Sequence, residues 1–133
     1  MLTIVDTDLW VEGERGNPAF LRWLRGVESV VTTDVSRAEF LIGVHGVAER
    51  KVRERAAAYY REQVRACPVV EAEREDYETA GRLAGEARRT GAGKPGLGDA
   101  LIGAIALRLG AEVATRNVKD FEALGVEAVN PLA

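Results

Sequence analysis

The pattern of apolar and polar positions predicts short buried strands that alternate with helices. Residues 2–5 form an apolar run with β-branched Ile4 and Val5, and this run ends abruptly on the polar triplet Asp6-Thr7-Asp8. Four further stretches are typical of extended chain: residues 28–33, 69–70, 111–115 and 126–129. Strands separated by helical segments predict one α/β domain over residues 1–133, with a mainly parallel central sheet of about four strands covered by helices on both faces.

Helical periodicity and end signals predict the segments between the strands. The expected helices cover residues 9–14, 18–25, 36–44, 47–66, 76–89, 100–109 and 117–124. Asn17 and Pro18 are a typical N-cap and first residue for the second of these helices. The side chains expected on buried helix faces include Leu21, Gln63 and Tyr77.

Composition limits the chemistry that is open to this chain. A single cysteine, Cys67, excludes an internal disulfide, and a single histidine, His45, excludes a His-rich zinc site. Metal chemistry would therefore use oxygen ligands and hard cations such as Mg²⁺. The net charge of −3 provides no overall field that attracts nucleic acid, so such binding needs a local basic surface. The sequence has no apolar run of membrane-span length and no signal-peptide pattern, which predicts a cytoplasmic protein without membrane contact.

Several carboxylates lie where strands end or where the neighbouring helices begin. Asp6 ends the first strand, Glu39 is expected in the first turn of the helix after the second strand, and Asp99 opens the most apolar helix. Asn117 and Asp120 follow the strand after that helix. In a right-handed βαβ arrangement the carboxyl ends of parallel strands meet at one edge of the sheet, so the four carboxylates are expected to converge there.

Each of these polar residues also has a purely structural explanation. Ser36 and Glu39 have the spacing of a capping box, Asp99 can cap its own helix, and Asn117 has the same spacing to Asp120. Taken together, however, four anions at one edge would repel one another and raise one another's pKa unless a cation compensates. A divalent cation relieves that repulsion, and Mg²⁺ held in this way can activate water and neutralise a phosphodiester.

Four sequence blocks resemble the PIN-domain ribonucleases of the VapC type. They are Val5-Asp6-Thr7, Ser36-Arg-Ala-Glu-Phe-Leu-Ile-Gly43, Asp99-Ala-Leu-Ile-Gly-Ala-Ile-Ala106 and Ala114-Thr-Arg-Asn-Val-Lys-Asp-Phe121, and they occur in the family's order over nearly the whole chain. The resemblance implies metal binding by Asp6, Glu39 and Asp99. The family's fourth polar position falls on Asn117, with Asp120 nearby, and either residue could complete the site. Thr7 and Thr115 would position metal-bound water or phosphate through their hydroxyls.

The same resemblance implies a Mg²⁺-dependent endoribonuclease, with Mn²⁺ as a substitute, that acts as the toxin of a type II toxin–antitoxin pair. The implied partners are an RNA substrate, a cognate antitoxin protein and a second copy of the toxin in a homodimer. Arg116 and Lys119 flank the acids and would lie beside a bound phosphate. The expected catalytic residues are Asp6, Glu39, Asp99, Asn117 and Asp120, and the expected metal ligands among them are Asp6, Glu39, Asp99 and Asp120.

Two other functions fit part of the sequence. Asp6 and Asp8 have the spacing of the nucleophile and general acid of a haloacid-dehalogenase-like phosphatase. That assignment fails at the last motif, because Gly103 stands where a second acid should follow Asp99, and it gives Glu39 no role. The second alternative is a PIN fold that binds RNA or protein without cleaving. In the nuclease interpretation Asp8 is a turn or helix-start residue.

Overall fold

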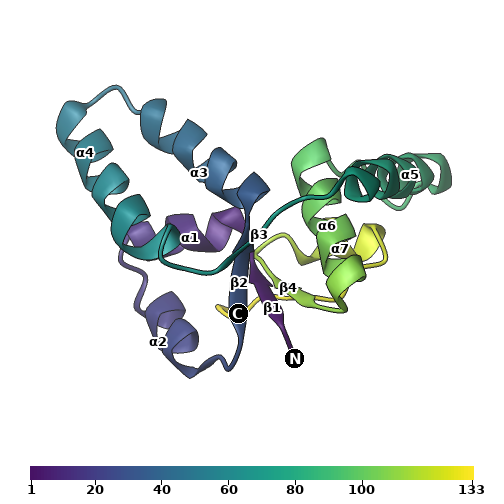
Figure 1. The fold of residues 1–133 in the computed structure, drawn as a ribbon, viewed down its shortest axis with the longest axis horizontal. Helices are drawn as coiled ribbons and strands as arrows, with labels where there is room; N and C mark the ends of the chain where they lie inside the picture. The colour runs from purple at the N-terminus through teal and green to yellow at the C-terminus, as the bar shows by residue number, and fades with distance from the viewer.

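Five parallel strands form the central sheet in the computed structural model, which describes all 133 residues. They are β1 (Thr3–Val5), β2 (Val30–Thr33), β3 (Val69–Val70), β4 (Glu112–Ala114) and β5 (Ala128–Val129), in the spatial order β3-β2-β1-β4-β5 (Figure 1). The predicted α/β fold with a parallel sheet of about four strands is confirmed. The outermost strands, β3 and β5, have two residues each.

The course of the chain reverses at β1, in the middle of the sheet. From β1 the chain proceeds to β2 and β3 on one side, and then crosses over to β4 and β5 on the other side. Such a reversal opens a crevice beyond the carboxyl ends of the two central strands, where open α/β sheets bind their ligands. Asp6 directly follows β1 and Thr115 directly follows β4, so both residues lie at the point where the strand order reverses.

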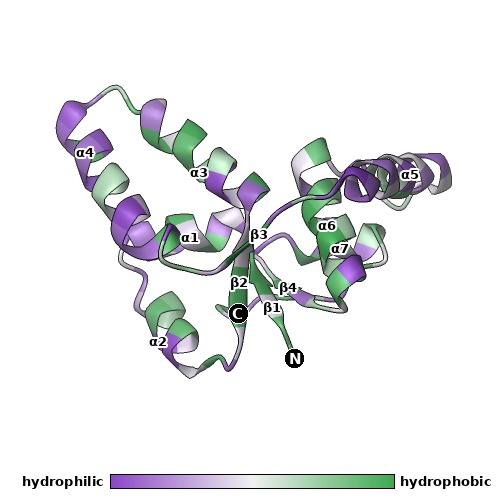
Figure 2. Ribbon diagram, viewed as in Figure 1, coloured by the Kyte–Doolittle hydropathy of each residue, from purple (hydrophilic) through white to green (hydrophobic).

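Helices cover both faces of the sheet, as predicted, and each face has its own apolar core. The helices are α1 (Thr7–Glu14), α2 (Pro18–Gly26), α3 (Asp34–His45), α4 (Arg50–Tyr59) with the π-helical turn η1 (Tyr60–Val64), α5 (Arg74–Thr90), α6 (Leu97–Leu109) and α7 (Val118–Ala123). One core packs Trp10 and Phe20 among α1 to α4, and the other packs Ile102 and Phe121 among α5 to α7 (Figure 1). Figure 2 shows the resulting contrast between hydrophobic α6 and the largely hydrophilic α4 and α5.

Most helices begin one to three residues from the predicted start, and in α3 and α6 the difference releases an acid from capping. Thr33 caps α3, because its hydroxyl oxygen accepts a hydrogen bond from the Ser36 backbone N–H at 3.0 Å. Glu39 therefore lies in the second turn of α3, not the first, and the predicted capping box is wrong. Helix α6 begins at Leu97 after the N-cap Gly96, so Asp99 does not cap it. The predicted cap at Asn17 is confirmed by a 2.9 Å bond from the Ala19 N–H.

Three side chains that the sequence placed inside are exposed. In η1 the Arg65 N–H donates to the Tyr60 carbonyl at 2.8 Å, five residues back. This wider turn shifts the buried face by one position, so Val64 is fully buried and Gln63 is exposed. The other two are Leu21, which is 38% exposed, and Tyr77, which is 54% exposed.

No helix of the structure combines the length and the apolar character needed to cross a membrane.

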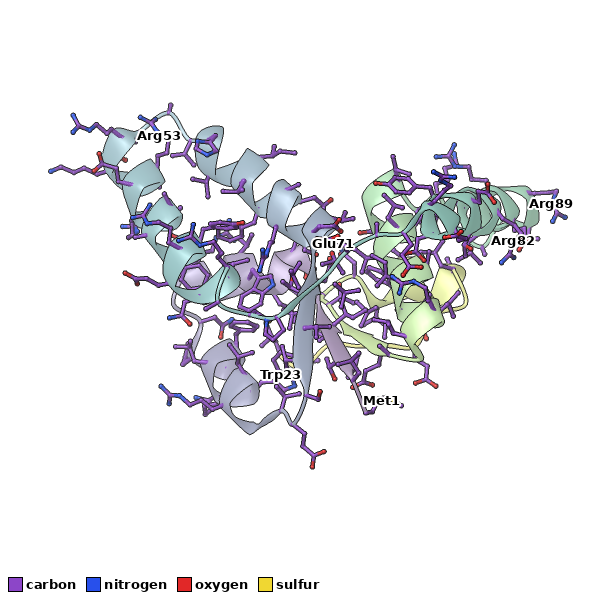
Figure 3. The ribbon with its side chains drawn as sticks, viewed as in Figure 1. Met1, Trp23, Arg53, Glu71, Arg82 and Arg89 are labelled. Atoms are coloured by element: carbon purple, nitrogen blue, oxygen red, sulfur yellow. The ribbon has the colours of Figure 1, made fainter.

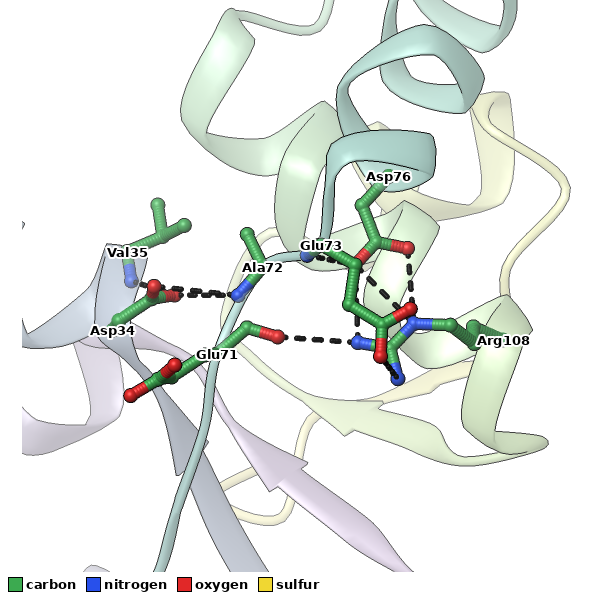
Figure 4. A network of polar contacts seen from close by, with 7 residues as sticks. All are labelled: Asp34, Val35, Glu71, Ala72, Glu73, Asp76 and Arg108. Atoms are coloured by element: carbon green, nitrogen blue, oxygen red, sulfur yellow. Dashed lines mark hydrogen bonds and ion pairs between the residues drawn. The ribbon is translucent and has the colours of Figure 1, made fainter.

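A polar network fixes the connection between β3 and α5 next to the sheet edge (Figure 4). The buried Asp76 carboxylate accepts hydrogen bonds from the Arg108 guanidinium at 3.0–3.2 Å and from the Glu73 N–H at 2.8 Å. The Ala72 N–H donates to Asp34 at the start of α3, at 3.1 Å. The network therefore joins α3, α5 and α6, two of which carry candidate site residues.

Candidate functional site at the carboxyl edge of the sheet

Asp6 and Thr115 are joined directly at the carboxyl ends of the neighbouring strands β1 and β4. Asp6 is 3% exposed and Thr115 is fully buried. The Thr115 hydroxyl donates to Asp6 Oδ2 at 2.8 Å, and the Thr7 backbone N–H donates to Asp6 Oδ1 at 2.8 Å. Both oxygens of Asp6 are thus held by groups at the ends of the two central strands, which fixes the carboxylate at the point where the chain reverses.

Asp8 also belongs to this group of acids, although the sequence interpretation left it as a helix-start residue. It lies in the first turn of α1, and its Oδ2 accepts hydrogen bonds from the Arg116 N–H at 3.0 Å and from the Thr115 hydroxyl at 3.4 Å. Its second oxygen, Oδ1, is buried without a hydrogen-bond partner. Helix α1 begins at Thr7, directly after Asp6 and two residues before the predicted start, and this keeps Asp8 at the same edge of the sheet.

Glu39 and Asp99 approach from the helices on opposite faces of the sheet. The Thr7 hydroxyl donates to Glu39 Oε1 at 2.7 Å and so ties α3 to the start of α1. On α6, a Cβ built on Gly98 would lie 2.5 Å from Glu39 Oε2, so the absence of a side chain at Gly98 makes room for this carboxylate. Thr7 therefore orients an acid, which is a more specific role than the sequence alone assigned to it.

The acids are close enough to perturb one another's ionisation. Burial raises the pKa of Asp6 to about 7, and the neighbouring charges of Asp8 and Asp99 add to the shift against the opposing hydrogen bonds. Burial raises the pKa of Asp99 to about 6, together with the charges of Glu39, Asp120 and Asp8. Burial also raises the pKa of Asp8. Five carboxylates thus form one electrostatically coupled group, which we call the acidic cluster: Asp6, Asp8, Glu39, Asp99 and Asp120.

The two remaining polar candidates follow β4. Asn117 is the residue before α7, but its side chain makes no capping hydrogen bond, and its backbone N–H donates to the Thr115 hydroxyl at 3.0 Å. Asp120 lies exposed in the first turn of α7, and its charge reaches Asp99. Arg116 and Lys119 are exposed on the same segment. The predicted convergence of the loop after β4 on the acids is therefore present for Asp120.

The donor chemistry of the cluster fits a hard divalent cation. All its side chains offer carboxylate oxygens, and Asp8 Oδ1 has no partner. Burial, and after it the charges of the neighbouring acids, raises the pKa of Asp6 and of Asp99, and a bound cation would offset both effects. No three His, Cys, Asp or Glu side chains, however, are already arranged closely enough to hold a metal ion. Coordination would therefore require side-chain rotation, for which the partly exposed Glu39 and Asp99 and the exposed Asp120 have room.

Comparison with known proteins assigns the family. The sequence profile of the PIN domain matches residues 3–127, and the chain therefore belongs to the PIN domain family. No curated protein matches it in sequence.

Similar solved structures include FitAcB from Neisseria gonorrhoeae, with a TM-score of 0.85, 20% identity and 97% of both chains covered. DNA-bound VapBC from Salmonella typhimurium has a TM-score of 0.80 and 20% identity over 98% of this chain and 99% of the other. VapBC2 from Rickettsia felis, bound to a DNA fragment from its promoter, has a TM-score of 0.78 and 17% identity over 98% of both chains. At these identities the likeness establishes the fold.

Proposed function

We propose that the chain is a metal-dependent endoribonuclease that acts as the toxin of a type II toxin–antitoxin pair in the cytoplasm. The observation that carries the proposal is the acidic cluster at the chain-reversal point of a PIN fold, where two carboxyls have pKa values raised to about 7 and about 6. Membership in the PIN family removes the basis for the haloacid-dehalogenase-like alternative.

In this proposal Asp6, Glu39, Asp99 and Asp120 hold the cation, and Asp8 supplies the additional oxygen that the sequence interpretation missed. Bound Mg²⁺ supplies a Lewis acid that lowers the pKa of water and offsets phosphodiester charge. Thr115 holds Asp6 in place and Thr7 holds Glu39, through the hydrogen bonds described above. Asn117 contributes its side-chain amide as a hydrogen-bonding group toward substrate.

An apolar groove beside the cluster supports an antitoxin partner. It has a volume of about 380 Å³ and lies between α1, α3 and α4. Its apolar lining consists of Val11, Phe40, Val44, Val47, Val52 and Ala56. Because Glu39 also lines this groove, a peptide segment bound in it would reach the acidic cluster. The solved neighbours include a structure described as a toxin–antitoxin complex from Klebsiella pneumoniae, with a TM-score of 0.76.

A homodimer completes the proposed assembly. Tyr77 of α5 and Leu97 of α6 line one surface hollow together with Ala38 of α3. Ile42, one turn further along α3, is 73% exposed, and Leu97 is 67% exposed. Large apolar side chains exposed on three adjacent helices are typical of a surface that meets another protein.

Removal of divalent metal tests the catalytic proposal. RNA cleavage is expected to disappear in EDTA and to return when excess Mg²⁺ or Mn²⁺ is added. Mg²⁺ must displace the protons that Asp6 and Asp99 hold. The Mg²⁺ concentration that gives half-maximal activity is therefore expected to fall as the pH rises from about 5.5 to about 7.5. This range covers about two units around the raised pKa values. Cleavage that persists unchanged in EDTA would rule out the metal mechanism. RNA binding without cleavage in Mg²⁺ or Mn²⁺ would favour the catalytically silent alternative.

Gly98→Ala is expected to reduce cleavage while leaving the fold intact. The new Cβ would displace the flexible Glu39 carboxylate rather than any backbone atom, so thermal unfolding should change little. Disturbing a group that orients metal ligands typically costs about 10–100-fold, and we expect kcat/KM to fall by about tenfold. Gly85→Ala, inside α5, is the matched control, because its Cβ would meet nothing within 4 Å. Equal activity of the two variants would contradict the placement of Glu39 in the site.

A further inference from the structure

A polar hollow lies next to the acidic cluster, on the side of β4 and β5. Its volume is about 480 Å³, and it is lined by Arg116, Asn117, Val118, Lys119, Asp120 and Asn130. Two of these side chains are cationic, two carry amides and one is a member of the cluster. The hollow thus combines hydrogen-bond donors and positive charge directly beside the carboxylates.

The two other large hollows that contain a cluster residue are unsuited to an anion. The lining of the groove between α1, α3 and α4 is mostly apolar, and its two cations, Arg15 and Arg55, are matched by two acids, Glu14 and Glu39. The hollow that contains Tyr77 and Leu97 has no cation in its lining and has two acids, Asp34 and Glu39. Of the three linings, only that of the hollow with Arg116, Lys119 and Asp120 contains more cations than acids.

Both the backbone and the guanidinium of Arg116 are held by hydrogen bonds. Its backbone N–H donates to Asp8 Oδ2 at 3.0 Å, and its Nη1 donates to Glu12 Oε1 at 2.6 Å. Glu12 is itself fixed, because its Oε2 accepts from Asn17 Nδ2 at 3.2 Å and its side chain is 15% exposed. The pair with Glu12 occupies one of the five N–H donors of the guanidinium, so the others stay available to a ligand. The Arg116 side chain is 53% exposed.

Asn130 occupies the opposite wall of the hollow, just after β5. Its Oδ1 accepts a hydrogen bond from the Leu132 N–H at 2.9 Å, which fixes the side chain and assigns the oxygen an internal partner. The remaining NH₂ group is a donor without an internal partner of its own. The hollow therefore presents donors from two separate segments, the loop after β4 and the turn after β5.

We propose that this hollow binds a phosphodiester of single-stranded RNA adjacent to the bond that is cut, with Arg116, Lys119 and Asn130 as its contacts. This inference rests on the proposed nuclease function and adds to it the path of the substrate away from the acids. Glu12 acts as a positioning residue, because it holds the Arg116 guanidinium beside the cluster. Cationic contacts to phosphate displace counterions, so they leave a measurable signature in the salt dependence of binding.

The test measures the affinity of the protein for a fluorescent single-stranded RNA of mixed sequence over a range of KCl concentrations. The Ca²⁺ concentration is fixed, and the RNA is checked for integrity. Each phosphate contact to single-stranded nucleic acid contributes about 0.7 to the slope of log affinity against log salt. Lys119→Gln and Arg116→Gln are each expected to reduce the slope by about 0.7. Arg89→Gln is the matched control, since Arg89 projects from the far end of α5 (Figure 3).

Asn130→Asp provides a second, independent variant. The aspartate keeps the oxygen that accepts from Leu132, so the turn is preserved, but it places a negative charge in the hollow. RNA affinity is expected to fall about tenfold, about 1.4 kcal/mol. If Arg116→Gln, Lys119→Gln and Asn130→Asp all bind RNA as wild type does while wild type cleaves RNA, the inference is wrong and the nuclease function stands. If wild type neither binds nor cleaves RNA with Mg²⁺, both proposals are wrong.

Discussion

Asp6→Asn is expected to abolish RNA cleavage and, at the same time, to stabilise the metal-free protein above pH 7. Loss of a group that fixes charge stabilisation in the transition state typically lowers kcat by about a hundredfold to a thousandfold. Asparagine fits the site, because its amide oxygen can accept from the Thr7 N–H and its NH₂ can donate to the Thr115 hydroxyl, which then turns toward Asp8. The loss of activity would thus arise without a disturbed fold.

The gain in stability follows from the raised pKa of Asp6. An unfolded chain releases this proton near the ordinary pKa of 3.8, whereas the folded protein holds it up to about 7. Between these values the folded state binds the extra proton, so its stability falls as the pH rises and the full cost is present above pH 7. One pKa unit corresponds to about 1.4 kcal/mol, which makes the cost for this buried group about 4 kcal/mol.

Thermal unfolding in EDTA at several pH values measures this effect. At pH 8 the melting temperature of Asp6→Asn should exceed that of wild type by roughly 10 °C. The difference should vanish at about pH 4, close to the unperturbed pKa of an aspartate. Added Mg²⁺ should stabilise wild type and not the variant. Glu28→Gln is the control for charge alone, because Glu28 is exposed and precedes β2, at the end of the strands opposite the cluster. A variant that is less stable than wild type at pH 8 would contradict the electrostatic account of the cluster.

The sequence predicts well where Asp6 and Thr115 lie, because the ends of two apolar runs mark the ends of the two strands at which the chain reverses. The apolar runs end where β1 and β4 end, and parallel strands bring those ends together without any detailed packing. The position of Asp6 next to Thr115 follows from this alone. Asp8 was missed because its partners, Thr115 and the Arg116 N–H, lie more than 100 residues away in sequence, and no local pattern encodes such a contact.

Competing local signals explain the errors. Thr33 and Ser36 are both good N-caps, and the sequence offers no reason to prefer Thr33, whose hydroxyl oxygen accepts from the Ser36 N–H. The choice matters, because it decides whether Glu39 turns back to its own helix or reaches Thr7. The π turn buries Val64 in place of Gln63, and a uniform helical period of about 3.6 residues does not predict such a turn.

Asp76→Ala is expected to cause a large loss of stability without altering the chemistry of the acidic cluster. Burial raises the pKa of Asp76, but hydrogen bonds from Arg108 and from the Glu73 N–H outweigh burial, and the pKa lies below its ordinary value. The alanine variant removes all these hydrogen bonds and leaves the Arg108 guanidinium without its principal partner. The Arg108 side chain is 28% exposed. Removing one member of a buried ion pair costs about 3–5 kcal/mol, and we expect the lower end because water reaches Arg108.

Chemical denaturation of wild type, Asp76→Ala, Arg108→Met and the double variant measures this loss. Because the two residues share their hydrogen bonds, the double variant should be less destabilised than the sum of the single ones. The contribution of Asp76 is present above pH 3.8 and is lost as the pH falls through its lowered pKa, so wild type should lose its advantage over the alanine variant in acid. Glu78→Ala, at an exposed position in the following turn of α5, should cost little and serves as the control. Equal stabilities of Asp76→Ala and Glu78→Ala at pH 7 would show that the network in Figure 4 does not anchor α5. The expected difference would instead show that the Asp76–Arg108 pair holds the start of α5 against α6.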